Sequence, residues 1–177
     1  MRYSVNDEGL TSKDRSDYQQ QINPNTYVVI HLQQFVLVPF EHDTVGLEPY
    51  VRDERFGVRW ASQDIYEGAA YQFVANVSKD VLGRTAYRNR PHYRKRLPNF
   101  VTLEYHGGSP HLNICIRRPD TWSLDDFTEV CKRHGEANQW LRMKGKSFYC
   151  EDRTGDCGRY SLKAGATILK RSMSFHR

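Results

Sequence analysis

FVTLEYHGGSPHLNICI, residues 100–116, is the stretch of sequence that decides the fold. Residues 100–105 and 112–116 are rich in β-branched and aromatic side chains, which is typical of strands, and the HGGSPH segment between them contains a Gly-Gly turn signal. Two strands joined by so short a connection pair in antiparallel fashion. We therefore expect this hairpin to be the basis of the sheet.

The hairpin places three polar side chains on one face of that sheet. A two-residue turn puts Glu104 opposite His111, whereas a four-residue turn puts Glu104 opposite Asn113. Both turns leave the three side chains on the same face, because side chains alternate along a strand. A carboxylate, an imidazole and an amide oxygen can hold a divalent cation such as Mg²⁺ or Mn²⁺. An ordinary solvated Glu–His pair is the alternative.

The segments before the hairpin predict strands and one helix. YVVI at 27–30 and FVLVPF at 35–40 favour strands, and the charged, Gly- and Pro-containing residues 41–60 favour a loop. From Ser62 onward, apolar residues recur every four positions, which indicates an amphipathic helix that ends at Gly83.

The segments after the hairpin complete an α+β pattern. Ser123 and Asp126 form an acidic variant of a capping box at the start of an amphipathic helix that Gly135 closes. SFYC at 147–150 predicts a strand, and GDCGRYSLKAGATILKR at 155–171 predicts a helical segment. This order of elements predicts a central antiparallel sheet with helices packed against it.

The length of 177 residues suits one domain. Residues 1–25 are polar and lack a hydrophobic period, so we expect a flexible tail there and a single domain over residues 26–177. No apolar run approaches the roughly 20 residues of a membrane helix, and no secretory signal is visible, so we expect no membrane partner. The four cysteines have no CxxC spacing, which favours a reducing, cytoplasmic location.

The net charge of +5 hides a strong asymmetry along the chain. Residues 1–83 carry 7 Lys and Arg against 12 Asp and Glu, whereas residues 84–177 carry 19 against 9. Such asymmetry indicates either a polyanionic partner or a solvated basic face. The segment 84–96, which Pro91 makes a connector rather than a helix, concentrates the candidate nucleic-acid contacts: Arg84, Arg88, Arg90, Arg94, Lys95 and Arg96.

Tyr160 and Lys163 lie three residues apart in the predicted last helix. Their hydroxyl and ammonium groups would share one helical face and could converge on one anion. A boundary pair on an amphipathic helix is the ordinary interpretation, because YxxK alone is a weak motif. GKS at 145–147 is not a phosphate loop, since Trp140 stands where the first glycine is required.

In combination these features resemble the HUH endonuclease superfamily, the rolling-circle replication initiators. HLNICI is similar to their second motif, with His111 matching its first histidine, and Glu104 stands where many circular replication initiators have an acidic metal ligand. Tyr160 and Lys163 match the YxxK motif. One departure is that Asn113 replaces the second histidine, which weakens the expected metal site.

The resemblance implies an HUH/ferredoxin-like fold and a DNA nicking and joining enzyme. A divalent metal would polarise a phosphate of single-stranded DNA or of a DNA hairpin at the origin of a phage, plasmid or related mobile element. Tyr160 would attack phosphorus to leave a 5′-phosphotyrosine, and Lys163 would neutralise charge on the phosphate or support the phenolate. A host helicase is the expected partner, because 177 residues leave no room for a motor domain.

Three alternative functions stay open. The first is a non-catalytic protein of the same fold that binds single-stranded nucleic acid, in which Asn113 marks a decayed metal site. The second is an HUH-type transposase. The third is an RNA-binding domain, which is disfavoured because FVTLEY and LNICI lack the spaced aromatic residues that stack on bases.

Overall fold

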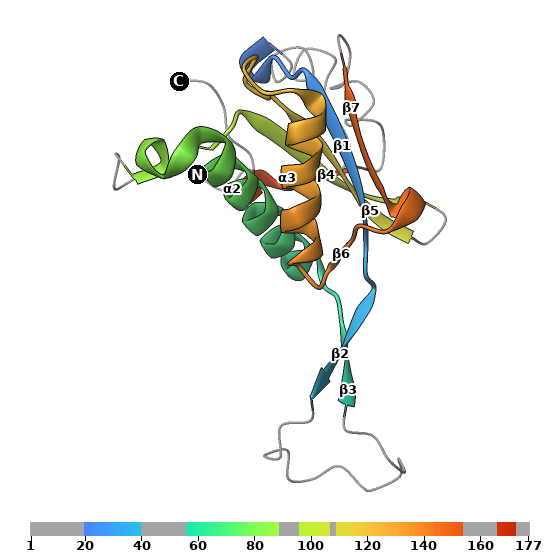
Figure 1. The fold of residues 1–177 in the computed structure, drawn as a ribbon. Coiled ribbons are helices and arrows are strands. Elements are labelled where there is room, and N and C mark those ends of the chain that lie inside the picture. The colour runs from blue at the N-terminus through green and yellow to red at the C-terminus, as the bar shows by residue number, and fades with distance from the viewer. Residues whose placement is uncertain (1–19, 40–55, 89–95, 107–108, 154–165, 173–177) are drawn as a thin grey trace, which may run out of the picture.

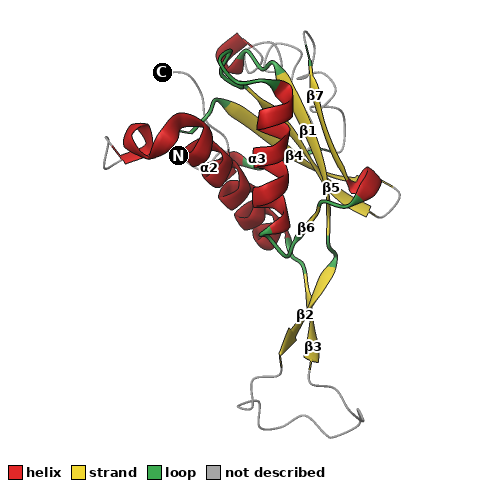
Figure 2. Cartoon of the chain, in the orientation of Figure 1, coloured by secondary structure: helices red, strands yellow, loops and turns green. Residues whose placement is uncertain are grey.

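The protein is described by a computed structural model, which covers residues 20–39, 56–88, 96–106, 109–153 and 166–172. It is an α+β fold, as predicted, with a six-stranded antiparallel sheet and two helices packed against it (Figures 1 and 2). The elements, in chain order, are β1 (Thr26–Leu32), β2 (Phe35–Pro39), β3 (Phe56–Trp60), α2 (Gln63–Arg88), β4 (Asn99–His106), β5 (Ser109–Ile116), α3 (Leu124–Glu136), β6 (Leu141–Arg142), the 3₁₀ helix η1 (Gly145–Ser147), β7 (Phe148–Asp152), β8 (Thr167–Ile168) and the 3₁₀ helix η2 (Lys170–Ser172).

The β4–β5 hairpin lies at the centre of the sheet. β5 pairs with β4 on one side and with β1 on the other. β8 extends the sheet beyond β4, and β6 and β7 both pair with the outer edge of β1. The register places Glu104 opposite His111, which confirms the two-residue turn among the two predicted alternatives.

One face of the sheet forms the main core with α2 and α3. Leu103, Leu112 and Ile114 are buried on this face and belong to the same cluster as Val74 of α2 and Phe127 of α3. Burying each such side chain stabilises the fold by roughly 1.5–3 kcal/mol relative to leaving it in water. Figure 1 shows both helices on this side of the sheet, so the opposite face carries the residues that alternate with this core, both the polar ones and a smaller apolar cluster that includes Phe100 and Cys115.

The two helices begin where the sequence predicts. Ser123 caps α3 by accepting a hydrogen bond from the backbone N–H of Asp126. Gly83 interrupts α2 with a left-handed φ of 77°, as a glycine stop should, but helical structure resumes and continues to Arg88. The prediction that the connector begins at residue 84 was therefore wrong, because the backbone bends at Gly83 without ending the helix.

The prediction of a loop over residues 41–60 was wrong for its last part. Phe56–Trp60 forms β3, which pairs with β2 in a separate two-stranded sheet, while residues 40–55 lie outside the described part of the chain. We call β2 and β3 the arm, since Figure 1 shows them projecting away from the body. Cross-strand pairing with β2 overrides the charged composition that favoured a loop.

The helix predicted over residues 155–171 is also corrected where it can be followed. Residues 154–165 lie outside the described chain, and Thr167–Ile168 forms β8, antiparallel to β4. η2 follows, and Leu169 is fully buried in the core. Thr167 and Ile168 are both β-branched, and the edge of β4 offers hydrogen-bond partners to their backbone. This segment therefore forms a strand instead of the predicted helix.

Part of the predicted tail is packed against the body. Ile22 is buried in a second, smaller core cluster, and the Asn25 side chain exchanges hydrogen bonds with the backbone of Arg118. The folded region therefore starts earlier than residue 26, while residues 1–19 lie outside the described structure. Among the described helices, none has the length and apolar character needed to cross a membrane.

Candidate functional site

Glu104 and His111 form the centre of the candidate site, on the sheet face away from the helices. They are direct cross-strand partners, and His111 Nε2 lies 3.2 Å from Glu104 Oε2. Glu104 is only 4% exposed, which is unusual for a carboxylate. The predicted Glu–His pair is therefore present, but it is shielded from solvent rather than solvated.

Asn113, the third predicted ligand, lies two residues further along β5 on the same face. It is 1% exposed, and the Tyr27 hydroxyl donates a 2.6 Å hydrogen bond to its Oδ1. A phenol can also accept a hydrogen bond. If the amide turned over, Nδ2 would donate to Tyr27 and Oδ1 would face the other way, so Tyr27 can hold Asn113 in either orientation.

Two polar atoms beside this pair are buried without partners in the described structure. Asn113 Nδ2 and Thr102 Oγ1 belong to direct cross-strand partners, and neither atom makes a hydrogen bond within the described residues. Thr102 is fully buried. An unsatisfied buried polar group costs about 1–3 kcal/mol, so such atoms are retained where a ligand or a bound water can reach them.

His31 of β1 is a neighbour of the site that was not recognised in the sequence. It is the cross-strand partner of His111, and the two imidazole rings stack with centroids 5.6 Å apart. Burial, together with the nearby His111 and Arg142, lowers the pKa of His31. A lowered pKa keeps this imidazole neutral at neutral pH, so two adjacent rings can be accommodated without charge repulsion.

The donor set fits a weakly held divalent cation. Two ligands about 2.1 Å from one ion at a right angle are about 3.0 Å apart, close to the 3.2 Å between Glu104 and His111. Over the described residues there is no cluster of three His, Cys, Asp or Glu side chains suited to a metal. The protein would thus supply one carboxylate, one imidazole and the Asn113 amide, leaving other positions to water, as Mg²⁺ prefers.

The predicted nucleophile and most of the predicted nucleic-acid contacts cannot be compared with this geometry. Arg84 and Arg88 lie in the last turns of α2, where only the backbone is described. The residues outside the described structure are Arg90, Arg94, Lys95, Tyr160 and Lys163.

Arg96, the last of the predicted nucleic-acid contacts, is engaged in the fold. Its guanidinium donates to the backbone carbonyls of Arg171 and Ser172 and lies over the Tyr71 ring, 5.1 Å from the centroid. Arg171 lies on the same ring at 4.9 Å. Arg96 therefore connects the segment after β8 to α2. This structural role accounts for an arginine at this position without a nucleic-acid contact.

The sequence pattern contains a signal for Tyr27 and His31, the two site residues that sequence analysis missed. Tyr27 and His31 alternate with Val28 and Ile30 along β1, and the alternation places them on the polar face. Their contact with Asn113 and His111 depends on β1 pairing with β5, which joins residues 80 or more positions apart. Comparisons with protein-family models, with curated proteins and with solved structures find no match for this chain.

Proposed function

We propose that this protein nicks and rejoins single-stranded DNA through a tyrosine nucleophile with the help of a divalent metal. The observation that carries the proposal is the buried Glu104–His111 pair, 3.2 Å apart on the central strands, with the Asn113 amide on the same face. This is the arrangement expected from the resemblance to HUH endonucleases, whose metal is held on paired strands of a sheet. Initiation of rolling-circle replication of a mobile element is the process in which we expect it to act.

Each residue of the site would have a distinct role. Glu104, His111 and Asn113 would hold Mg²⁺ or Mn²⁺, which when bound withdraws electron density from a phosphate oxygen. Tyr27 would fix the amide of Asn113, and His31 would support His111 by stacking. Because Glu104 and Asn113 are buried, charge interactions at the site would be weakened little by solvent.

Tyr160 is the proposed nucleophile. Its phenol would lose its proton and its oxygen would form a bond to phosphorus while the bond from phosphorus to the 3′ oxygen breaks, and the released 3′ oxygen would take up a proton to become a hydroxyl. Attack by a 3′ hydroxyl would reverse the step and restore the phenol, so no ATP is needed. β7 and β8, which precede and follow Tyr160 in the chain, pair with β1 and β4, the two strands that flank β5.

The test is a covalent adduct on a denaturing gel. Labelled single-stranded oligonucleotides that span the origin of the element, incubated with the protein and Mn²⁺, should yield a protein–DNA species of increased mass. We expect Tyr160→Phe and His111→Ala each to lower its yield at least a hundredfold, since each removes a reacting or metal-binding group. His134→Ala is the matched control, because His134 also pairs with a carboxylate but lies on α3.

A metal-binding measurement tests the site apart from the chemistry. Asn113→His restores a second imidazole, so we expect it to raise Mn²⁺ affinity roughly tenfold in calorimetry, and Glu104→Gln to abolish binding. DNA binding without any adduct, in a protein that also fails to bind Mn²⁺, would refute the nicking function.

The second candidate is a non-catalytic protein that binds single-stranded nucleic acid. The observation in its favour is the 2.6 Å hydrogen bond from Tyr27 to Asn113 Oδ1, which occupies the very oxygen that a metal would need. That function predicts DNA binding that is equally tight with Mn²⁺ or with EDTA.

A further inference from the structure

The strand register defines two rows of side chains across the polar face of the sheet, because cross-strand partners lie on the same face. The first row consists of Arg142, His31, His111 and Glu104. The second row consists of Tyr149, Val29, Asn113 and Thr102. Both rows end in the buried candidate site, and both begin with an exposed residue at the outer edge of β1.

That edge carries a set of basic side chains that we call the edge cations: Arg142, Lys144 and Lys146. All of them are exposed, and in the described structure none forms an ion pair or a hydrogen bond. Gly145, with a left-handed φ of 58°, begins η1 between the two lysines. Lys144 and Lys146 therefore stand on either side of this glycine at the start of the short helix.

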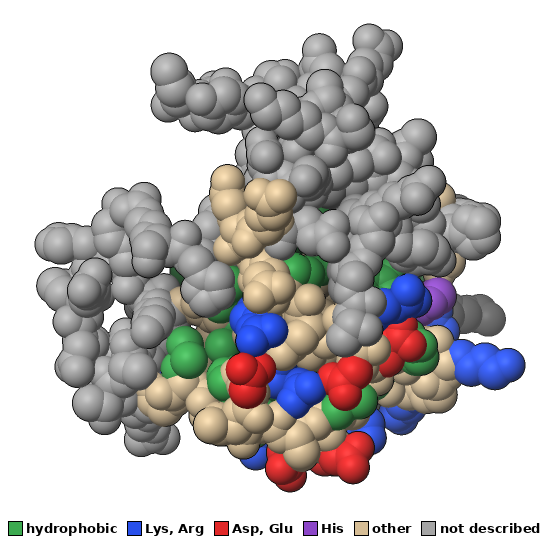
Figure 3. All heavy atoms as spheres, turned by 90° about the horizontal axis from the view of Figure 1, so that it is seen from above, with side chains coloured by type: hydrophobic (Ala, Val, Ile, Leu, Met, Phe, Trp, Pro, Cys, Tyr) green, Lys and Arg blue, Asp and Glu red, His purple; other side chains and the backbone are tan. Residues whose placement is uncertain are grey.

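Most other basic side chains in the described structure have a partner, and Lys79 of α2 is the exception. Five of them form ion pairs with carboxylates, namely Arg117, Arg118, Lys132, Arg133 and Arg153. Figure 3 views the end of the body opposite the arm and shows acidic and basic side chains next to one another on its described part. The edge cations thus differ from the paired basic residues in having no described carboxylate that neutralises their charge.

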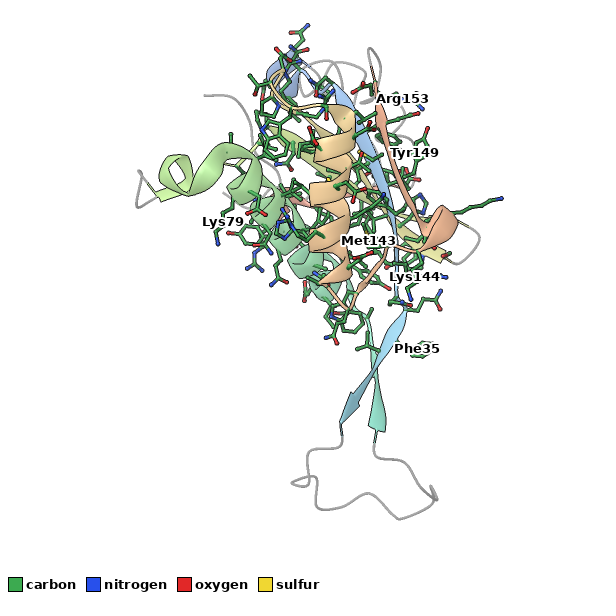
Figure 4. All side chains as sticks on the ribbon, in the orientation of Figure 1. Phe35, Lys79, Met143, Lys144, Tyr149 and Arg153 are labelled. Atoms are coloured by element: carbon green, nitrogen blue, oxygen red, sulfur yellow. The ribbon has the colours of Figure 1, made fainter. Side chains whose placement is uncertain are left out.

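Exposed aromatic rings flank the edge cations. Tyr149 and Phe35 are each 48% exposed, which is high for large aromatic side chains. Figure 4 shows Phe35, Lys144 and Tyr149 along the side of the molecule away from the helices. Unpaired cations beside exposed rings are the combination by which proteins bind single-stranded nucleic acid, with phosphates on the cations and bases on the rings.

We propose that the β6–η1–β7 edge, through the edge cations and Tyr149, binds the strand of DNA that enters the candidate site. The inference rests on the proposed function in taking DNA as the ligand, and it assigns the binding to other residues than those of the basic segment 84–96. Arg142 and Tyr149 would hold consecutive nucleotides, and the two rows would lead from them to Glu104 and Asn113. Phe35, at the start of the arm, would lie next along the same path.

The test measures binding of a fluorescein-labelled 20-nucleotide oligothymidylate by anisotropy, in EDTA and over a series of salt concentrations. Each phosphate contact contributes about 0.7 to the slope of log K against log salt. We expect Lys144→Gln/Lys146→Gln to weaken binding at least tenfold near 0.1 M salt and to lower the slope by about 1.4. Lys79→Gln/Lys132→Gln, on the helices, removes the same charge and should leave the slope unchanged.

Tyr149→Ala should weaken binding roughly tenfold while leaving the salt slope intact, because stacking is not ionic. Equal effects of the two lysine pairs would overturn the proposal, and so would tighter binding of a duplex than of the single strand. An oligouridylate of the same length distinguishes DNA from RNA as the ligand, and clearly preferred RNA would also contradict the proposal.

The binding proposal and the nicking function can fail separately. Normal DNA binding by the edge without any adduct would refute only the nicking function. Adduct formation that is undiminished in the lysine variant would refute only the proposal that this edge binds the DNA.

Discussion

At the scale of a single residue, Tyr27 connects the buried polar face of the sheet to the rest of the fold. It is itself buried, donates to Asn113 Oδ1 at 2.6 Å, and lies under the Arg153 guanidinium, whose carbon is 5.5 Å from the ring centroid. A hydrogen bond between two buried side chains on different strands fixes both rotamers. The Asn113 side chain is therefore held in place by Tyr27 of the neighbouring strand as well as by β5.

Tyr27→Phe is expected to destabilise the protein by about 1–3 kcal/mol, because it leaves the buried Asn113 oxygen without its donor. Urea unfolding followed by tryptophan fluorescence measures the change. Tyr149→Phe is the matched control: it also removes a phenol hydroxyl, but at an exposed position, and should cost less than about 0.5 kcal/mol. Equal losses in the two variants would show that the Tyr27 hydrogen bond contributes nothing specific.

At the scale of elements, α2 and α3 are joined by a charge cluster as well as by the core. Asp80 of α2 accepts from His134 Nε2 at 2.7 Å and from Arg133 at 2.8 Å, both on α3. Burial alone would raise the pKa of Asp80, but the hydrogen bonds and charges of His134 and Arg133 together outweigh it, and the pKa lies below its usual value. The cluster therefore favours the ionised carboxylate in the folded state.

Asp80→Asn should reduce stability by about 0.5–1 kcal/mol near pH 5, a modest amount because the cluster is partly exposed. A lowered folded-state pKa gives stability that is present above the unfolded pKa of about 4 and is lost as the pH falls through the folded value. The difference between wild type and variant should thus shrink between about pH 5 and pH 3 in urea unfolding. Asp120→Asn, in an exposed ion pair within one loop, should change stability by less than about 0.5 kcal/mol throughout. A difference for Asp80 that is constant with pH would contradict this account.

At the scale of the whole molecule, the body and the arm are separate sheets. The described backbone pairings of β2 and β3 are with each other, and the arm is joined to the body where Gln34 accepts from the Ala61 N–H and where Val36 reaches the main core. The six-stranded sheet does not depend on β2 or β3 for any of its pairings. The arm is therefore expected to be an addition to a self-sufficient body.

Replacing residues 39–56 by Asn-Gly, which joins Val38 to Gly57 through a two-residue hairpin turn, should leave the body folded. We expect the free energy of unfolding to change by less than about 1 kcal/mol, since shortening a connection alters its closure entropy only slightly. Circular dichroism and urea unfolding measure this. Loss of a single cooperative transition would show that the body needs residues 39–56.

Local sequence signals were sufficient for the centre of the fold. The Gly-Gly signal and the alternation on both sides of it determine the β4–β5 hairpin and the face that Glu104 and His111 share, whereas their direct pairing was one of two predicted registers. Ser123 and the apolar period likewise define α3. These features depend on residues close together in the chain, for which turn and capping chemistry is decisive.

The remaining features were decided by tertiary structure, because they depend on partners far away in the sequence. β3 and β8 are strands only because β2 and β4 offer edges to pair with, and composition alone favoured a loop and a helix. The row that joins Glu104 to His31 follows from β1 pairing beside β5. The sequence by itself thus determined which polar residues share a strand face, whereas long-range pairing decided which strands lie beside them and which edge of the sheet leads to them.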